Sequence, residues 1–218
     1  MNKLTAIGAL AFACASLPSY AQSSDVMTGI DALSCKALLC LSSSLRPGEC
    51  NEALSHYFDI KKYTKGIFDL EKTINARFNF LAICPMAVTP EITERRRAIA
   101  RGAGRCDPEF LNATYGKTIY RYKSRNWGFG SSYYDISAIK TVTMSALPSY
   151  CVAYNDHAWT YDLSTKYVGN PQTGGYWVKA SEYDAAQAKW NAEHSGIVGS
   201  SWLYSEEYPR SSSSGHEY

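Results

Sequence analysis

The chain has 218 residues and a formal net charge of +2, from 22 lysines and arginines against 20 aspartates and glutamates. This near balance argues against a nucleic-acid-binding protein, because binding to a phosphate backbone requires clustered positive charge. The length suffices for one large domain or two small ones, and no internal repeat divides it.

Residues 1–21, MNKLTAIGALAFACASLPSYA, have the features of a secretory signal peptide. Lys3 provides a positive start, and residues 4–17 form an apolar stretch that is too short to span a bilayer. Pro18 ends this stretch, and Ser19-Tyr20-Ala21 places small residues at the two positions that a signal peptidase requires. We therefore predict cleavage after Ala21 and a periplasmic protein.

Two other interpretations of this segment have less support. A buried N-terminal helix would show a polar face, and the apolar stretch has none. Attachment of a lipid at Cys14 would require small residues before the cysteine, but Phe12 is bulky. No later segment is apolar for long enough to cross a membrane, so we predict a mature chain without a transmembrane segment.

Residues 26–104 are predicted to form a helical domain. In VMTGIDALSCKALLCLSS, Thr28 and Asp31 resemble a capping box, and apolar residues then recur at helical spacing. A turn at residues 46–48 precedes a second helix in ECNEALSHYFDI, and Pro47 suits a first helical position.

Two further helices are predicted in the same domain. GIFDLEKTINARFNFLAICP is typical of a helix, and its apolar stripe consists of Ile67, Leu70, Ile74, Phe78 and Leu81. PEITERRRAIARGAG gives another, and the run Arg95-Arg96-Arg97 on it is expected to be a solvated face.

Residues 105–198 differ in character, because all five tryptophans and fourteen of the seventeen tyrosines lie beyond residue 110. Strands and hairpins are predicted in KTIYRYKS, YYDISAIKTVTM, CVAYNDHAWTYDL and KYVGNPQTGGYWVKA. SEYDAAQAKWNAEHS predicts one more helix, with Ser181 as its cap, and residues 199–218 are predicted to be a flexible tail. The predicted fold class is α+β: a disulfide-stapled half of about three to four helices, followed by an aromatic-rich β-hairpin region with one further helix.

Removal of the signal peptide leaves six of the seven cysteines: Cys35, Cys40, Cys50, Cys84, Cys106 and Cys151. An even number in an exported protein indicates disulfides, here three. A zinc site is disfavoured, because the Cys-x4-Cys-x9-Cys spacing lacks the tight ligand pairs of structural zinc sites and has no histidine couple nearby. We predict no metal ligands and no cofactor.

No group of residues dictates a reaction. His157 with Asp156 beside it is the best candidate for a catalytic base, but Asn-Asp favours a turn and an even cysteine count leaves no free thiol. His56 is expected to be a surface or packing residue, His194 a structural residue at a helix end, and His216 part of the tail. Motifs for zinc proteases, serine hydrolases and phosphate binding are missing. The two carboxylates of a glycan hydrolase meet only in space, and the sequence nominates no pair.

Helix geometry restricts the disulfide pairing. Residues five apart rise about 7.5 Å along a helix, and this exceeds the limit of about 7 Å between the Cα atoms of a disulfide. Cys35 and Cys40 therefore cannot bond each other, and we favour Cys40–Cys50 across the turn together with Cys35–Cys84. The swapped set, Cys35–Cys50 and Cys40–Cys84, is nearly as plausible. Cys106 and Cys151 would then bracket the first strands of the aromatic half.

The segments CKALLCLSSSLRPGECNEALSHYFDI and RFNFLAICP resemble the TrbM/KikA/MpfK family of conjugal transfer proteins. The shared elements are Cys-x4-Cys-Leu-Ser, Arg-Pro-x-Glu-Cys, a Tyr-Phe pair and Phe-Leu-x-x-Cys-Pro, over roughly residues 30–86. The resemblance places Cys35, Cys40, Cys50 and Cys84 at family positions and implies no catalytic residue. Beyond Cys106 we recognise no family pattern.

The resemblance implies an exported, non-enzymatic accessory protein of a conjugative type IV secretion system, whose partners are other secretion-system proteins of the cell envelope. It would act through protein contacts in mating-pair formation or in channel or pilus assembly. The alternatives are a peptidoglycan hydrolase and a secreted effector. The aromatic half suits an interaction surface, because Tyr and Trp supply large contact areas, but ordinary β-core packing explains most of these residues as well.

Overall fold

The computed structural model describes residues 27–127, 130–158, 160, 162–195 and 202–210. The predicted signal peptide, the cleavage site after Ala21 and His216 lie outside the described residues. The predicted α+β class is confirmed, since the described residues contain seven α-helices and three small antiparallel sheets.

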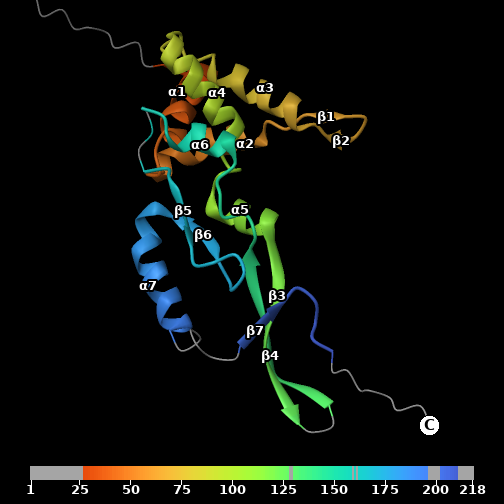
Figure 1. Cartoon of the computed structure of the whole chain (residues 1–218). Helices are drawn as coiled ribbons and strands as arrows, with labels where there is room; N and C mark the ends of the chain where they lie inside the picture. Colours follow the sequence, from red (N-terminus) through yellow and green to blue (C-terminus); the bar gives the residue numbers. More distant parts are fainter. Residues whose placement is uncertain (1–26, 128–129, 159, 161, 196–201, 211–218) are drawn as a thin grey trace, which may run out of the picture.

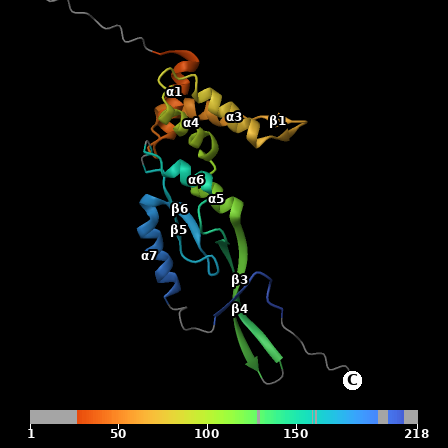
Figure 2. The same ribbon diagram turned by 45° about the horizontal axis from the view of Figure 1, so that its top comes forward.

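Five of the helices gather at one end of an elongated molecule (Figures 1 and 2). They are α1 (Gly29–Leu41), α2 (Asn51–Asp59), α3 (Leu70–Leu81), α4 (Pro90–Gly102) and α6 (Ser149–Asn155), with a 3₁₀ turn at Gly48–Cys50 before α2. α4 lies centrally, because it contacts α1, α3 and α6. Helix α6 therefore belongs spatially to the helical body, although its sequence lies in the aromatic half.

The helix starts follow from local capping. The side chain of Asp69 accepts a hydrogen bond from the Lys72 N–H before α3, and Thr89 accepts one from Ile92 before α4, where Pro90 occupies the first turn. Thr28 is the N-cap of α1, but its side chain makes no capping hydrogen bond. The predicted capping box is therefore correct in position and wrong in its hydrogen bonding.

The apolar stripe predicted for the third helix is too long at its N-terminal end. Ile67 is 74% exposed and lies in a small hairpin of β1 (Tyr63–Thr64) and β2 (Ile67–Phe68) that projects beside α3 (Figure 1). The reason is the turn between these strands, where Lys65 and Gly66 both have positive φ, as a two-residue hairpin turn requires. Ile74 and Leu81 of the stripe are buried as expected.

The β-region begins with α5 (Pro108–Tyr115), which leads into β3 (Gly116–Trp127) and β4 (Gly130–Val142). These two strands form a long antiparallel ribbon that extends away from the helices (Figure 1). A second hairpin, β5 (Thr165–Val168) with β6 (Tyr176–Lys179), is covered by α7 (Tyr183–His194). A 3₁₀ turn at Ala180–Glu182 precedes α7, so Glu182 rather than the predicted Ser181 is its N-cap.

Two further segments differ from prediction. CVAYNDHAWTYDL was predicted to be a strand, but its first part forms α6, because Cys151 and Tyr154 point to the helical core at a spacing of three. The predicted tail contains β7 (Trp202–Ser205), which pairs with the free edge of β3 to give the order β4-β3-β7. Arg121 and Lys123 hold the Trp202 ring at 4.8 and 4.5 Å, so strand pairing and ring contacts both order β7.

One hydrophobic core connects the two ends of the molecule. It includes Leu41, Tyr57 and Ile99 from the helices together with Leu111 of α5 and Trp177 of β6. None of the described helices has the length and hydropathy that a membrane span requires.

Candidate functional site

All six cysteines predicted to pair lie in disulfides, and each residue is at most 7% exposed. The bridges are Cys35–Cys84, Cys40–Cys50 and Cys106–Cys151, with Cα separations of 4.8, 5.9 and 5.4 Å. The structure thus has the first of the two pairings considered above. Cys35 and Cys40 share α1 and reach different elements, and β3 and β4 lie between Cys106 and Cys151. None of these six sulfurs is a free thiol that could act as a nucleophile.

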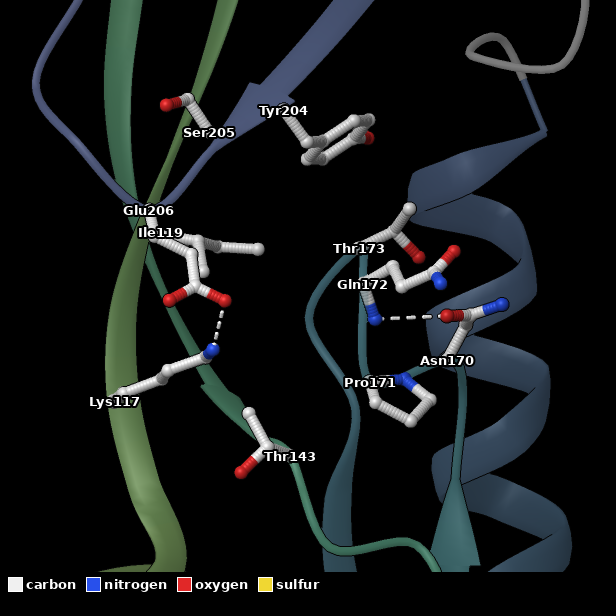
Figure 3. A pocket seen from close by; sticks show the side chains of 10 residues that line it. All are labelled: Lys117, Ile119, Thr143, Asn170, Pro171, Gln172, Thr173, Tyr204, Ser205 and Glu206. Carbon is white, nitrogen blue, oxygen red and sulfur yellow. Dashed lines mark hydrogen bonds and ion pairs between the residues drawn. The ribbon is translucent and has the colours of Figure 1, made fainter.

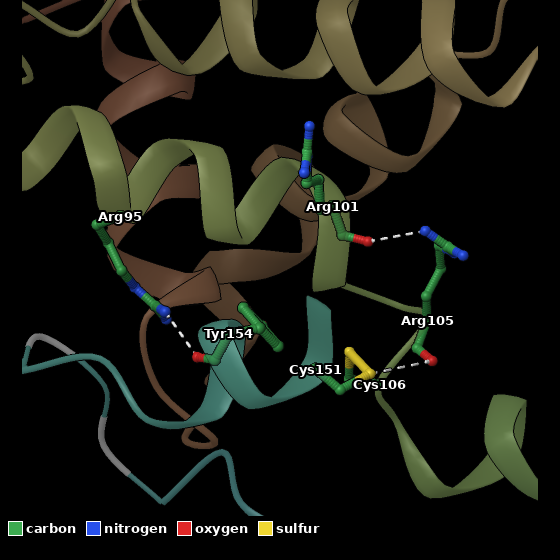
Figure 4. The surroundings of a disulfide bond; sticks show 6 residues. All are labelled: Arg95, Arg101, Arg105, Cys106, Cys151 and Tyr154. Carbon is green, nitrogen blue, oxygen red and sulfur yellow. Dashed lines mark hydrogen bonds between the residues drawn. A yellow bond between two sulfur atoms is a disulfide. The ribbon is translucent and has the colours of Figure 1, made fainter. Parts of the chain in front are cut away.

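The prediction that the run Arg95-Arg96-Arg97 of α4 is a solvated face is wrong for two of its three residues. Arg95 and Arg96 are only 2% and 7% exposed, and Arg97 alone of the three is exposed. The guanidinium of Arg95 donates from Nη1 to the Tyr154 carbonyl at 2.8 Å (Figure 4). It also donates from Nη2 to the Leu41 carbonyl at 3.3 Å and from Nε to the Ser42 hydroxyl at 3.3 Å. We call these four residues the Arg95 junction.

The Arg95 junction forms where α1 and α6 end. The last carbonyls of a helix have no hydrogen-bond partner inside it and carry partial negative charge. A cation placed there donates hydrogen bonds to these carbonyls and interacts favourably with their charge. Burial lowers the pKa of Arg95, but an arginine starts so far above neutrality that it stays charged. Its ring contact with Tyr154, at 5.0 Å to the centroid, adds a further attraction.

Two buried tyrosines extend this polar network. The Tyr154 hydroxyl donates to the Leu41 carbonyl at 3.0 Å, and the Tyr57 hydroxyl donates to the Ile99 carbonyl at 3.1 Å. Burial raises the pKa of Tyr154 to about 12 and raises that of Tyr57 as well. Neither hydroxyl can therefore serve as an acid or base near neutral pH, and both tie helices together.

The third bridge lies next to this network (Figure 4). Cys106 follows α4 and Cys151 lies on α6, so the bridge and the Arg95 junction fasten the same two helices. Arg105 covers the site by donating to the Arg101 carbonyl at 3.2 Å, with its guanidinium 4.1 Å from the Tyr150 ring centroid. The Cys106–Cys151 bridge and the Arg95 junction together hold α4 and α6 against each other.

A cavity of about 780 Å³ lies in the β-region between the β3–β7 pair and the turn after β5 (Figure 3). It is lined by Lys117, Ile119, Thr143, Asn170, Pro171, Gln172, Thr173, Tyr204, Ser205 and Glu206. Its one carboxylate, Glu206, forms an ion pair with Lys117. Because glycoside hydrolysis generally uses two carboxyl groups, the lining of this cavity does not supply that machinery.

The three histidines of the described residues lie in different parts of the fold, after α6, on α2 and at the end of α7. His157 lies in the turn after α6, and burial together with the charge of Arg95 lowers its pKa. His56 packs on Phe80 with ring centroids 4.9 Å apart. His194 ends α7, where its ring stacks on Trp190 and its nitrogens contact the carbonyls of Trp190 at 2.7 Å and Thr173 at 3.1 Å. Within the described part of the chain, no three His, Cys, Asp or Glu side chains are grouped as metal ligands would be.

The Arg95 junction is the feature that sequence reasoning missed. A signal for it was present, because Arg95 lies three residues after Ile92 and four before Ile99, on the face of α4 that packs inward. The identity of its acceptors could not be predicted, since they are two backbone carbonyls on α1 and α6 and the hydroxyl of Ser42, all distant in sequence.

Comparison with known proteins gives a family. The model of the TrbM family matches residues 26–191. The match extends beyond the segment of about residues 30–86 in which the sequence resemblance was recognised, and it includes the β3–β4 ribbon and most of α7. No curated protein and no solved structure matches the chain.

Proposed function

The chain belongs to the TrbM family of conjugal transfer proteins, and from this membership we propose that it is an exported, non-enzymatic accessory protein of a conjugative type IV secretion system. It acts through protein contacts in mating-pair formation or in channel or pilus assembly. Its partners are other secretion-system proteins of the cell envelope. The observation that carries the proposal is the family match over residues 26–191.

Export to the periplasm is the second part of the proposal. The sequence of residues 1–21 supports it, because it has the positive start, apolar stretch and small cleavage-site residues of a signal peptide. Three buried disulfides support it as well, because such bonds persist in oxidising compartments and are rare in the cytosol.

The use of the polar groups supports a non-enzymatic role. Arg95, Tyr57 and Tyr154 are hydrogen-bonded to backbone carbonyls, and the six mature cysteines are consumed in bridges. The cavity of about 780 Å³ in the β-region holds one carboxylate, already paired with a lysine. These groups fasten elements of the fold together.

A mating assay tests this proposal. We expect deletion of the gene from a donor strain to lower transfer frequency, and expression of the full chain to restore it. A version without residues 1–21 should fail to restore transfer, because it stays in the cytoplasm. Unchanged transfer after deletion would contradict the accessory role, and a clearing band for the purified protein on a peptidoglycan zymogram would overturn the non-enzymatic part.

A further inference from the structure

The β1–β2 hairpin and the two residues before it are exposed along their whole length. This segment, residues 61–68, has the sequence KKYTKGIF, and every one of its residues is exposed. It includes three large apolar side chains, since Tyr63 is 57%, Ile67 74% and Phe68 49% exposed. Apolar side chains that the fold leaves in solvent at one place mark a surface where another molecule binds. We call this segment the Lys61–Phe68 hairpin.

Hydrogen bonds fasten the base of the hairpin to α3. The Lys62 N–H donates to the Thr73 hydroxyl at 2.9 Å, and the Asp69 N–H donates to the Lys62 carbonyl at 2.8 Å. The Thr64 hydroxyl donates to the Asp69 carboxylate at 2.6 Å. The hairpin therefore projects beside α3, away from the rest of the helical body (Figures 1 and 2). A surface held in this way loses little conformational freedom on binding.

The apolar side chains lie on both faces of the hairpin. Tyr63 pairs with Phe68 across the strands, so their rings share one face, with centroids 6.0 Å apart. Ile67 pairs with Thr64 and lies on the other face. A protein surface covers one face of a two-stranded hairpin, whereas the boundary between lipid headgroups and acyl chains surrounds both. This arrangement favours a lipid surface over a protein partner.

The hairpin carries three positive charges and no negative one. Its lysines are Lys61, Lys62 and Lys65, and no ion pair within the described residues includes any of them. The nearest carboxylates along the chain are Asp59 and Asp69, and Asp69 is already paired with Lys72 at 3.7 Å. Exposed ammonium groups without a partner can bind lipid phosphates. Each contributes about fivefold to the affinity for an anionic membrane surface.

We propose that the Lys61–Phe68 hairpin binds the surface of an anionic phospholipid bilayer. Tyr63, Ile67 and Phe68 lie at the boundary between headgroups and acyl chains, where aromatic side chains such as Tyr are enriched. Lys65 is in the turn, and its aliphatic stem can lie among apolar groups while its ammonium reaches the phosphates. The inference goes beyond the proposed function, because the ligand is a lipid surface and not another protein of the apparatus.

Flotation with lipid vesicles tests the proposal. The chain of residues 22–218 contains every described element and lacks the apolar stretch of residues 4–17. We expect it to bind vesicles of phosphatidylglycerol and phosphatidylethanolamine, more weakly as the salt concentration rises, and to bind phosphatidylcholine vesicles about tenfold more weakly or worse. No binding to the anionic vesicles at low salt, or equal binding to the two compositions, would overturn the proposal.

Replacing the three lysines tests the charge. We expect the triple variant Lys61→Gln, Lys62→Gln, Lys65→Gln to bind the anionic vesicles more weakly by a factor on the order of 100. The matched control removes three exposed cations elsewhere, in the triple variant Arg101→Gln, Lys140→Gln, Lys189→Gln. It should bind within about threefold of the unmodified protein, because these charges lie more than a Debye length from the hairpin-bound surface. Equal losses in the two variants would overturn the assignment of binding to the hairpin.

Replacing the apolar side chains tests insertion. We expect the double variant Ile67→Ser, Phe68→Ser to bind about tenfold more weakly or worse, because two apolar side chains no longer enter the bilayer. The control is Leu45→Ser, Val88→Ser, whose side chains are 77% and 76% exposed elsewhere on the molecule. All four positions are exposed, so both variants should fold. Unchanged binding of the hairpin variant would overturn insertion.

Photocross-linking in donor cells separates lipid from protein as the ligand. The photoreactive residue p-benzoylphenylalanine replaces Ile67 in the full chain, and Leu45 is the matched control position. We expect residue 67 to label phospholipid and residue 45 to label none. Labelling from residue 67 of an acidic segment of another protein, of a second copy of this chain, or of no lipid at all would overturn the proposal. The vesicle results do not depend on transfer, so the accessory function can fail in the mating assay while the hairpin proposal stands.

Discussion

The helical body and the β-region of this protein are stabilised in different ways. All three disulfides end in the helical body or at its border, together with the Arg95 junction and the buried Tyr57. The β-region relies on strand pairing, ring contacts and a helix, α7, that has no buried residue. Short helices are only marginally stable alone, and α2 has nine residues. Disulfides and buried hydrogen bonds therefore supply stability that the short helices lack.

The largest expected effect comes from removing the long bridge of the helical body. The Cys35–Cys84 bond closes 49 residues and the Cys40–Cys50 bond only 10. Loop entropy predicts a loss of about 4 kcal/mol in the free energy of unfolding for the double serine variant at 35 and 84, and about 3 kcal/mol for that at 40 and 50. Urea unfolding without reductant measures both.

The unmodified protein tests the pairing itself. Peptide mapping under non-reducing conditions should recover Cys35 with Cys84 and Cys40 with Cys50. Recovery of Cys35 with Cys50, or a free thiol among the six cysteines, would contradict the structure.

The Arg95→Lys variant tests the second tie of the helical body. A lysine cannot contact at once the three acceptors that the guanidinium contacts, so at least one of these buried oxygens loses a donor. We expect a loss of about 3 kcal/mol in the free energy of unfolding. The exposed neighbour supplies the control, since Arg97→Lys should change stability by no more than about 0.5 kcal/mol. Equal effects at the two positions would show that burial of Arg95 contributes nothing.

A substitution in the β-region should destabilise only the residues around it. Trp202→Ala removes the ring that Arg121 and Lys123 contact, at a cost of about 1–2 kcal/mol. Hydrogen exchange should become faster at residues 120–123 of β3, which pair with β7, and stay unchanged around Tyr57. Faster exchange throughout both regions would mean that the ribbon and the helical body unfold as one unit.

The smallest effect concerns pH. The pKa of His157 is lowered in the folded chain, by burial first and by Arg95 second. The unfolded chain therefore binds a proton more readily, so stability is lost as the pH falls below about 6.5, the ordinary histidine value. His157→Gln should flatten the dependence of the unfolding free energy between about pH 5 and 7. A steeper dependence in the variant would reverse the sign assigned here.

The fold class and the positions of most elements could be predicted from the sequence, because helical spacing and aromatic runs are local signals. It failed where distant contacts decide. β7 needs the free edge of β3, and α6 forms where Cys151 and Tyr154 meet α4. Arg95 was assigned to the solvent because a run of three arginines is usually exposed, whereas its acceptors come from two other helices.

The two N-terminal bridges are nested, since Cys40–Cys50 lies inside the loop closed by Cys35–Cys84. If the chain is oxidised from its N-terminal end, Cys40 is the first cysteine available to Cys35. The Cys35–Cys84 bond passes over Cys40 and Cys50, so either α1 must form before oxidation and keep Cys35 and Cys40 apart, or a thiol exchange must correct the first bond. Formation of the native bonds therefore depends on the order of helix formation and oxidation, and the rate of oxidative refolding of the reduced chain with and without a disulfide isomerase measures that dependence.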